Sequence, residues 1–204
     1  MDTFWSTREQ LKLVLLFMLS FIFSEQSMNY SIADSLPSNM PLSKKILWGK
    51  DGIIRKLNLA PSSRVKELEL RSQMLQTHQK LGLLNMGLMG VQMYLGSDMY
   101  NKGNRDNATS HRYLGYSTFS IYMTTAGLQL FAPPAFRYSK GYSSIKVHRY
   151  LSYIHFIGMV LVPISGYYTA QYPNDPKPYE MHRNITTVTF SSYTLAFLMT
   201  LLPQ

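Results

Sequence analysis

His148-Arg149-Tyr150-Leu151-Ser152 opens the stretch that decides the fold, residues 147–168. After Arg149 this stretch contains no Asp, Glu, Lys or Arg, and its centre reads Ile157-Gly158-Met159-Val160-Leu161-Val162-Pro163. The opening pattern is a histidine, a polar pair, an aliphatic residue and a small residue. It recurs at His78, His111 and His182, about every 33 to 37 residues. A fixed spacing of this length indicates a repeated supersecondary unit.

Each copy of the pattern begins a run without acidic or basic side chains, over residues 81–97, 113–136, 150–174 and 184–204. Runs of this length can cross a bilayer as helices, which takes roughly 20 residues. A soluble four-helix bundle is the alternative, but its helices would need a charged outer face, which these runs lack. Short connections make neighbouring helices antiparallel. The sequence therefore predicts an all-α membrane protein, an antiparallel bundle of four transmembrane helices preceded by a short N-terminal apolar segment.

The chain before the bundle divides into two parts. Residues 1–25 read as a signal peptide or signal anchor, because Arg8 and Lys12 precede a short apolar run. Residues 26–76 read as a basic linker followed by an amphipathic helix over residues 62–77, and residues 77–204 as the four-helix core. The basic residues of the middle segment fit either attraction to lipid head groups or an ordinary solvated face.

Charge and cysteine content exclude several function classes. The formal net charge of +9 on 204 residues fits a nucleic-acid binder or a protein at an anionic membrane. Because the charges lie between the uncharged runs, we expect membrane lipid as the partner and no nucleic acid. Cysteine is absent, so disulfides, thiolate metal sites and covalently attached c-type haem are excluded.

The four pattern histidines fall into two pairs if neighbouring helices are antiparallel. His78 and His148 then lie at one end of the bundle, and His111 and His182 at the other. Two imidazoles that face each other across a bundle can bind haem iron from both sides, and without cysteine this haem is b-type. Zinc fits less well, since two ligands at one end are too few. The fifth histidine, His155, could line the interior or accept a hydrogen bond there.

Two groups of residues could support a haem at these histidines. Small residues four positions after each histidine share its helix face and leave room for a porphyrin edge; they are Gly82, Gly115, Ser152 and Thr186. Arginines follow three of the histidines and could pair with haem propionates, or could mark the head-group level of the membrane; they are Arg112, Arg149 and Arg183.

At these histidines the chain resembles the cytochrome b561 family, over about residues 74 to 204. The separations within the pairs, 70 residues from His78 to His148 and 71 from His111 to His182, are similar to that family's spacing. The resemblance implies a core of four transmembrane helices that holds two haems b with these four histidines as axial iron ligands. It also implies electron transfer across the membrane.

The expected function is therefore transmembrane electron transfer between a small reductant or quinol and an acceptor, or a redox partner protein, on the other side. Any enzymatic activity would be that of an oxidoreductase, because no acid–base pair, nucleophile motif or phosphate-binding loop appears. The expected location is integral to a membrane, the inner or plasma membrane in a bacterium, as a homodimer or a subunit of a complex. The alternative is a haem-free membrane scaffold or accessory subunit.

Overall fold

The structure is a computed structural model that describes residues 36–103, 105–138 and 141–202. Its elements in chain order are α2 (Leu42–Trp48), α3 (Ile53–Lys56), α4 (Arg64–Lys102), α5 (Ala108–Phe131), α6 (Ser144–Gln171) and α7 (Pro176–Thr200). No strand occurs among the described residues. The proposed signal peptide or anchor of residues 1–25 lies outside them.

The long helices begin and end at residues that suit helix termini. Ser63, Ser143 and Asp175 cap α4, α6 and α7, each accepting a hydrogen bond from a backbone N–H of the first turn. Helix α4 ends at Gly103, whose φ of 63° is left-handed and favours glycine. Helix α5 ends before Pro133 and Pro134, which cannot continue a helix.

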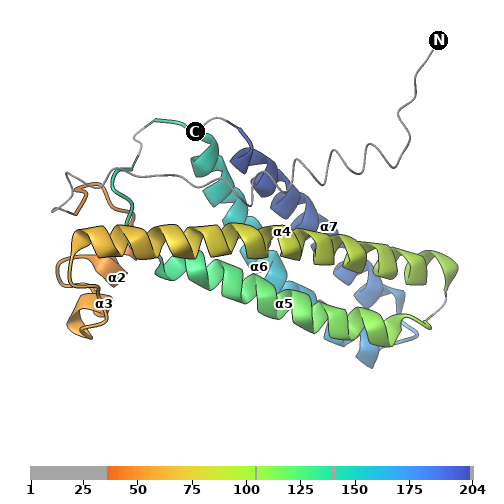
Figure 1. Ribbon diagram of the computed structural model, residues 1–204. Helices are drawn as coiled ribbons and strands as arrows, with labels where there is room; N and C mark the ends of the chain where they lie inside the picture. Colours follow the sequence, from red (N-terminus) through yellow and green to blue (C-terminus); the bar gives the residue numbers. More distant parts are fainter. Residues whose placement is uncertain (1–35, 104, 139–140, 203–204) are drawn as a thin grey trace, which may run out of the picture.

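The four long helices form two hairpins, α4 with α5 and α6 with α7, and contacts within each hairpin are more extensive than contacts between them. Figure 1 shows α5 running alongside α4, with α6 and α7 crossing behind them. The short helices α2 and α3 lie beside the beginning of α4, and α2 packs on α5 (Figure 1). The helix expected over residues 62–77 is the first part of α4, which continues without a break through His78.

Polar side chains lie in the interior of the bundle, while the outer face of α6 is apolar. Buried side chains include Asn85, Thr118, Thr125, His155 and Thr189. Apolar packing in the core centres on one cluster, made of Met89, Tyr122, Met159 and Tyr193. Helix α6 buries His155, Gly158, Met159 and Ser165, whereas its exposed residues include Ile154, Phe156, Ile157, Leu161 and Ile164.

The all-helical prediction is confirmed in the described residues. Among their helices, α6 alone has both the length and the apolar composition to cross a membrane. Helices α5 and α7 are 24 and 25 residues long, long enough to span, but their many Ser, Thr and Tyr residues lower their hydropathy. A bundle of four membrane-spanning helices is therefore not confirmed by composition.

Candidate functional site

His111 and His182 lie together at one end of the bundle. Their ring centroids are 6.3 Å apart and the rings are nearly perpendicular, at 81°. Two imidazoles that bind one metal ion from opposite sides, each nitrogen about 2 Å from the metal, have centroids about 6 Å apart. The separation of these two rings agrees with that value, and it is also the separation of two rings in edge contact.

A glycine on the neighbouring helix makes room for each of these two rings. A Cβ atom at Gly96 would stand 3.3 Å from Cε1 of His111, and one at Gly166 would stand 3.3 Å from Cε1 of His182. In both cases the Nδ1 side of the ring faces the glycine, so the Nε2 side is turned away from it. Nδ1 of His182 lies 2.9 Å from the Ser165 hydroxyl, whereas buried Nδ1 of His111 has no hydrogen-bond partner.

His78 and His148 occupy the other end, and both are fixed by a backbone carbonyl of the neighbouring helix. Nδ1 of His78 lies 2.9 Å from the carbonyl oxygen of Thr125, and Nδ1 of His148 lies 2.8 Å from that of Ala196. A carbonyl can only accept, so each Nδ1 carries the proton and each Nε2 keeps a free lone pair. Histidines that bind a metal are held in this way by a partner on the second nitrogen. The two rings are close enough for a charge on one to act on the other.

A layer of aromatic rings fills the space along the bundle between the two histidine pairs. The hydroxyl of Tyr122 is 2.7 Å from Nδ1 of His155, and the ring of His155 packs edge-on to those of Tyr122 and Tyr193. The Tyr193 hydroxyl donates to the carbonyl of Gly82 at 2.8 Å and also faces Asn85. Asn85 is fully buried, and its Oδ1 has no hydrogen-bond partner.

These contacts repeat between the two hairpins with an offset of 70 residues for the first helix and 71 for the second. Adding 70 to a position in α4 gives its counterpart in α6, and adding 71 to a position in α5 gives its counterpart in α7. The offset relates the histidines, their carbonyl partners, the cluster Met and Tyr residues and the glycines beside the rings. The pairs are His78 and His148, Met89 and Met159, Gly96 and Gly166, His111 and His182, Tyr122 and Tyr193, and Thr125 and Ala196. His155, which had no counterpart in the histidine pattern, corresponds to Asn85.

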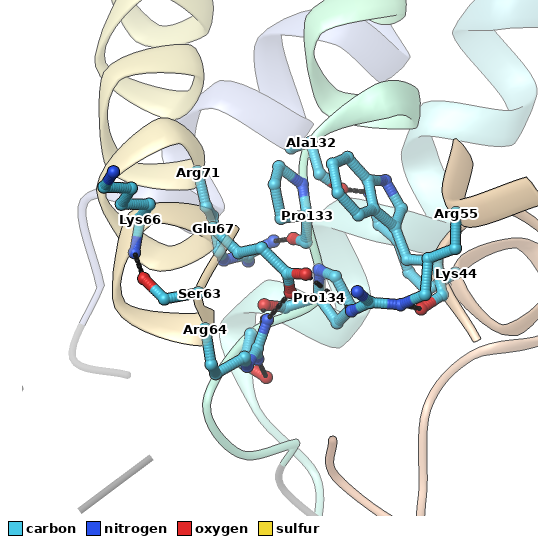
Figure 2. Close-up of polar contacts among 12 residues, drawn as sticks. Lys44, Arg55, Ser63, Arg64, Lys66, Glu67, Arg71, Ala132, Pro133 and Pro134 are labelled. Atoms are coloured by element: carbon cyan, nitrogen blue, oxygen red, sulfur yellow. Dashed lines mark hydrogen bonds and ion pairs between the residues drawn. The ribbon is translucent and has the colours of Figure 1, made fainter. Parts of the chain in front are cut away.

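A second group of polar contacts, which we term the basic cluster, joins α2 and the first turns of α4 to the end of α5. Its four donors are Lys44, Trp48, Arg64 and Arg71, and Figure 2 shows most of it in close-up. Together they occupy the carbonyl oxygens of seven consecutive residues, 129–135. Lys44 donates to Gln129, Leu130 and Ala132, Trp48 to Phe131, Arg71 to Pro133, and Arg64 to Pro134 and Ala135. The carbonyls that a helix end leaves unpaired are thus satisfied by side chains.

One buried carboxylate balances part of the charge of the basic cluster. Glu67 accepts from Arg55 at 2.5 Å and from Arg64 at 2.8 Å (Figure 2). Lys44 has no such partner, and burial together with the nearby charges of Arg71 and Arg149 lowers the pKa of Lys44 to about 7. Its three carbonyl acceptors oppose that effect, because an ammonium offers three donors.

The remaining residues predicted for a haem site lie in different surroundings. Arg112 and Arg183 are exposed and stack on Tyr113 and Tyr100, and Arg149 lies near the basic cluster. A Cβ atom on Gly82 would meet the Tyr193 hydroxyl, at 3.5 Å, and one on Gly115 would meet Gln92, at 3.4 Å. Neither glycine faces a histidine ring.

The ring-facing glycines, Gly96 and Gly166, lie on the neighbouring helix, so a pattern that follows each histidine along its own helix does not predict them. The offset of 70 residues between α4 and α6 relates these two glycines to each other, and it is the signal in the sequence that points to them. Ser165 and the carbonyls of Thr125 and Ala196 carry no sequence signal of their own.

Comparison of the chain with protein-family models, curated proteins and solved structures finds no match. Among the described residues, no group of three or more His, Cys, Asp or Glu side chains could hold a metal ion.

Proposed function

We propose that the chain is a membrane cytochrome with two b-type haems, which carries electrons across a bilayer. His111 and His182 would hold one haem, and His78 and His148 the other. Each haem would supply reversible one-electron chemistry at its iron. The donor would be a small reductant or quinol, and the acceptor a molecule or redox partner protein on the other side.

The observation that carries the proposal is the geometry of His111 and His182. Two histidines 71 residues apart in the chain lie with centroids 6.3 Å apart, which suits two imidazoles on opposite sides of one iron. Each ring has a glycine against its Nδ1 side. Because Nδ1 of His182 is occupied by Ser165, Nε2 is the nitrogen left to act as a ligand.

The second pair supports the same chemistry through its tautomers. Both His78 and His148 donate Nδ1–H to a carbonyl oxygen, which fixes the ring and makes Nε2 more basic. Arg149 is the predicted propionate partner that fits best, since it is half-buried at this end of the bundle. Arg112 and Arg183 are less suited to that role, because their guanidinium groups lie over tyrosine rings.

Membrane insertion of all four long helices is supported by where polar and apolar residues lie. The interior holds Asn85, Thr118, Thr125 and Thr189, while the outer face of α6 is covered by large aliphatic and aromatic side chains. In water that distribution would leave a large apolar surface unburied. In lipid it is favourable, because hydroxyl and amide groups then join the helices from within.

Optical spectroscopy of the purified protein, with haem counted per chain, tests the proposal. We expect b-type bands on reduction and a ratio near two. His111→Ala and His148→Ala should each remove about one haem, whereas His155→Gln, a matched change at a buried histidine outside the pairs, should leave the ratio unchanged. Absence of reduced b-type bands, or an unchanged ratio in both alanine variants, would refute the proposal.

The competing hypothesis is a haem-free membrane scaffold or accessory subunit. In such a protein, the hydrogen bonds that His78, His148, His155 and His182 make within the chain would serve only to join the helices. Haem depletion during growth separates the two hypotheses. A scaffold should accumulate normally without haem, whereas a cytochrome should lose stability, because a ligand that binds only the folded state stabilises it.

A further inference from the structure

Helix α2 buries a lysine and a tryptophan and exposes two aliphatic side chains. Lys44 is 5% exposed and Trp48 is 3% exposed, whereas Leu42 is 73% exposed and Ile46 is 52% exposed. Residues four apart share one face of a helix, so the lysine and the tryptophan face inward and the two aliphatic residues face outward. The inward face is held by the basic cluster. The outward face has no partner among the described residues.

Exposed aliphatic side chains also occur in α3 and in the turn that follows it. We define the outer patch as Leu42, Ile46, Ile53, Leu57 and Leu59, of which every member is about half exposed or more. Exposed lysines at 45, 50 and 56 lie among these residues, against one exposed acid, Asp51. A short segment that exposes aliphatic side chains and several lysines is typical of a segment that lies in the interface of an anionic membrane.

The docking site of α2 fixes the level at which this patch lies. The basic cluster ties Lys44 and Trp48 to the carbonyls of residues 129–135. These residues are the end of the uncharged run 113–136, the place where a membrane-spanning α5 would leave the hydrocarbon. A segment attached there lies at the head-group level, with its free face available to acyl chains.

We propose that residues 42–59 form an interfacial anchor on an acidic lipid leaflet. The outer patch enters the boundary between head groups and acyl chains, and Lys45, Lys50 and Lys56 meet lipid phosphates. The anchor thereby assigns the His78 and His148 end of the bundle to the leaflet with the more acidic lipids. This inference rests on the membrane insertion proposed for the long helices, and not on the haems.

Site-directed spin labelling tests the anchor directly, since the chain has no cysteine. Ile46→Cys and Leu57→Cys report on the outer patch, and Lys45→Cys is the matched control one residue away. Ile157→Cys on the exposed face of α6 is the reference for insertion of the bundle. Each labelled full-length protein is placed in vesicles of phosphatidylcholine alone or with phosphatidylglycerol, and the nitroxide is exposed to oxygen and to a water-soluble nickel chelate.

In acidic vesicles we expect the labels at 46 and 57 to be more accessible to oxygen than to nickel, and the label at 45 to show the reverse. Access of nickel to 46 and 57 while 157 stays in lipid would overturn the anchor and leave the spanning helices standing. Access of nickel to 157 as well would refute both. Dipolar broadening between labels at 46 would show that a second copy covers the patch instead of lipid.

The lysines are tested separately with the triple variant Lys45→Gln, Lys50→Gln and Lys56→Gln. In vesicles with phosphatidylglycerol, we expect this variant to bring the label at 46 to the shallower depth found in phosphatidylcholine alone. An unchanged depth would overturn the assignment to acidic lipids.

Discussion

The two helical hairpins are copies of one arrangement that differ at a few interior positions. In both, the first helix carries a histidine whose Nδ1 bonds a carbonyl of the second helix. In both, a threonine hydroxyl of the second helix bonds a carbonyl one turn back at 2.7 Å, Thr118 in α5 and Thr189 in α7. The shared contacts set the positions of the paired histidines, so the differences can alter one end of the bundle without moving the other.

Three differences stand out. Ser165, which bonds His182, corresponds to Leu95, which explains why Nδ1 of His111 has no partner. His155, which bonds Tyr122, corresponds to Asn85. The basic cluster is attached to the first hairpin, at the end of α5. The residue type at a single interior position thus decides whether the nearby histidine has a hydrogen-bond partner on Nδ1.

The largest expected effect comes from breaking the basic cluster, which joins α2 and the first turns of α4 to the end of α5. Glu67→Gln leaves Arg55 and Arg64 without their carboxylate, and removing one partner of a buried ion pair costs about 3–5 kcal/mol. Thermal unfolding in detergent should show this loss. Hydrogen exchange should place it in the last turns of α5 and leave α7 protected.

The matched control for that change is Asp98→Asn. It removes the exposed ion pair between Asp98 and Lys102, which lies on the same helix. Exposed pairs contribute little to stability, so we expect no measurable change in the unfolding temperature. Equal losses in the two variants would show that the basic cluster does not hold α5.

The basic cluster also marks the limit of what the sequence could predict. The all-helical fold and the meeting of His111 with His182 followed from charge-free runs and antiparallel order. The cluster did not, because its acceptors are backbone carbonyls and its lysine is buried, a rare position for that residue. Residues 26–76 consequently read as a linker and one helix, although Lys44 and Trp48 within them dock on α5.

The second prediction compares the two tyrosines that the repeat relates. Tyr122→Phe leaves buried Nδ1 of His155 without a partner, which costs about 1–3 kcal/mol. Tyr193→Phe removes a bond to the carbonyl of Gly82, which keeps its place in the helix α4 ladder, so the cost should be about 0.5–1.5 kcal/mol. Thermal unfolding of both variants measures the difference. If Tyr193→Phe were the more damaging change, the hydroxyl of Tyr193 would have a larger role at Asn85.

The third prediction concerns pH at the first hairpin. The pKa of Lys44 is lowered from 10.5 to about 7 in the folded chain, so between these values the unfolded chain binds the proton more tightly. The free energy of unfolding should therefore rise from pH 7 to pH 10.5, by at most about 1.4 kcal/mol per pH unit from this group. Lys44→Met should remove that part of the slope. An identical slope in both proteins would show that the carbonyl acceptors keep Lys44 charged.

The smallest effect is expected from exchanging the difference between positions 95 and 165. Leu95→Ser offers His111 the hydroxyl that His182 already has, and Leu95→Ala is its control, because both variants lose the leucine packing. The serine variant should be more stable than the alanine variant by about 0.5–1.5 kcal/mol, the net value of one hydrogen bond. Ser165→Ala should cost a similar amount at His182. If the protein binds haem, the slower loss of haem from the serine variant provides a second measurement. Equal stability of the serine and alanine variants would mean that Nδ1 of His111 is not the nitrogen that faces α4, and that the two ends of the repeat hold their histidines in different ways.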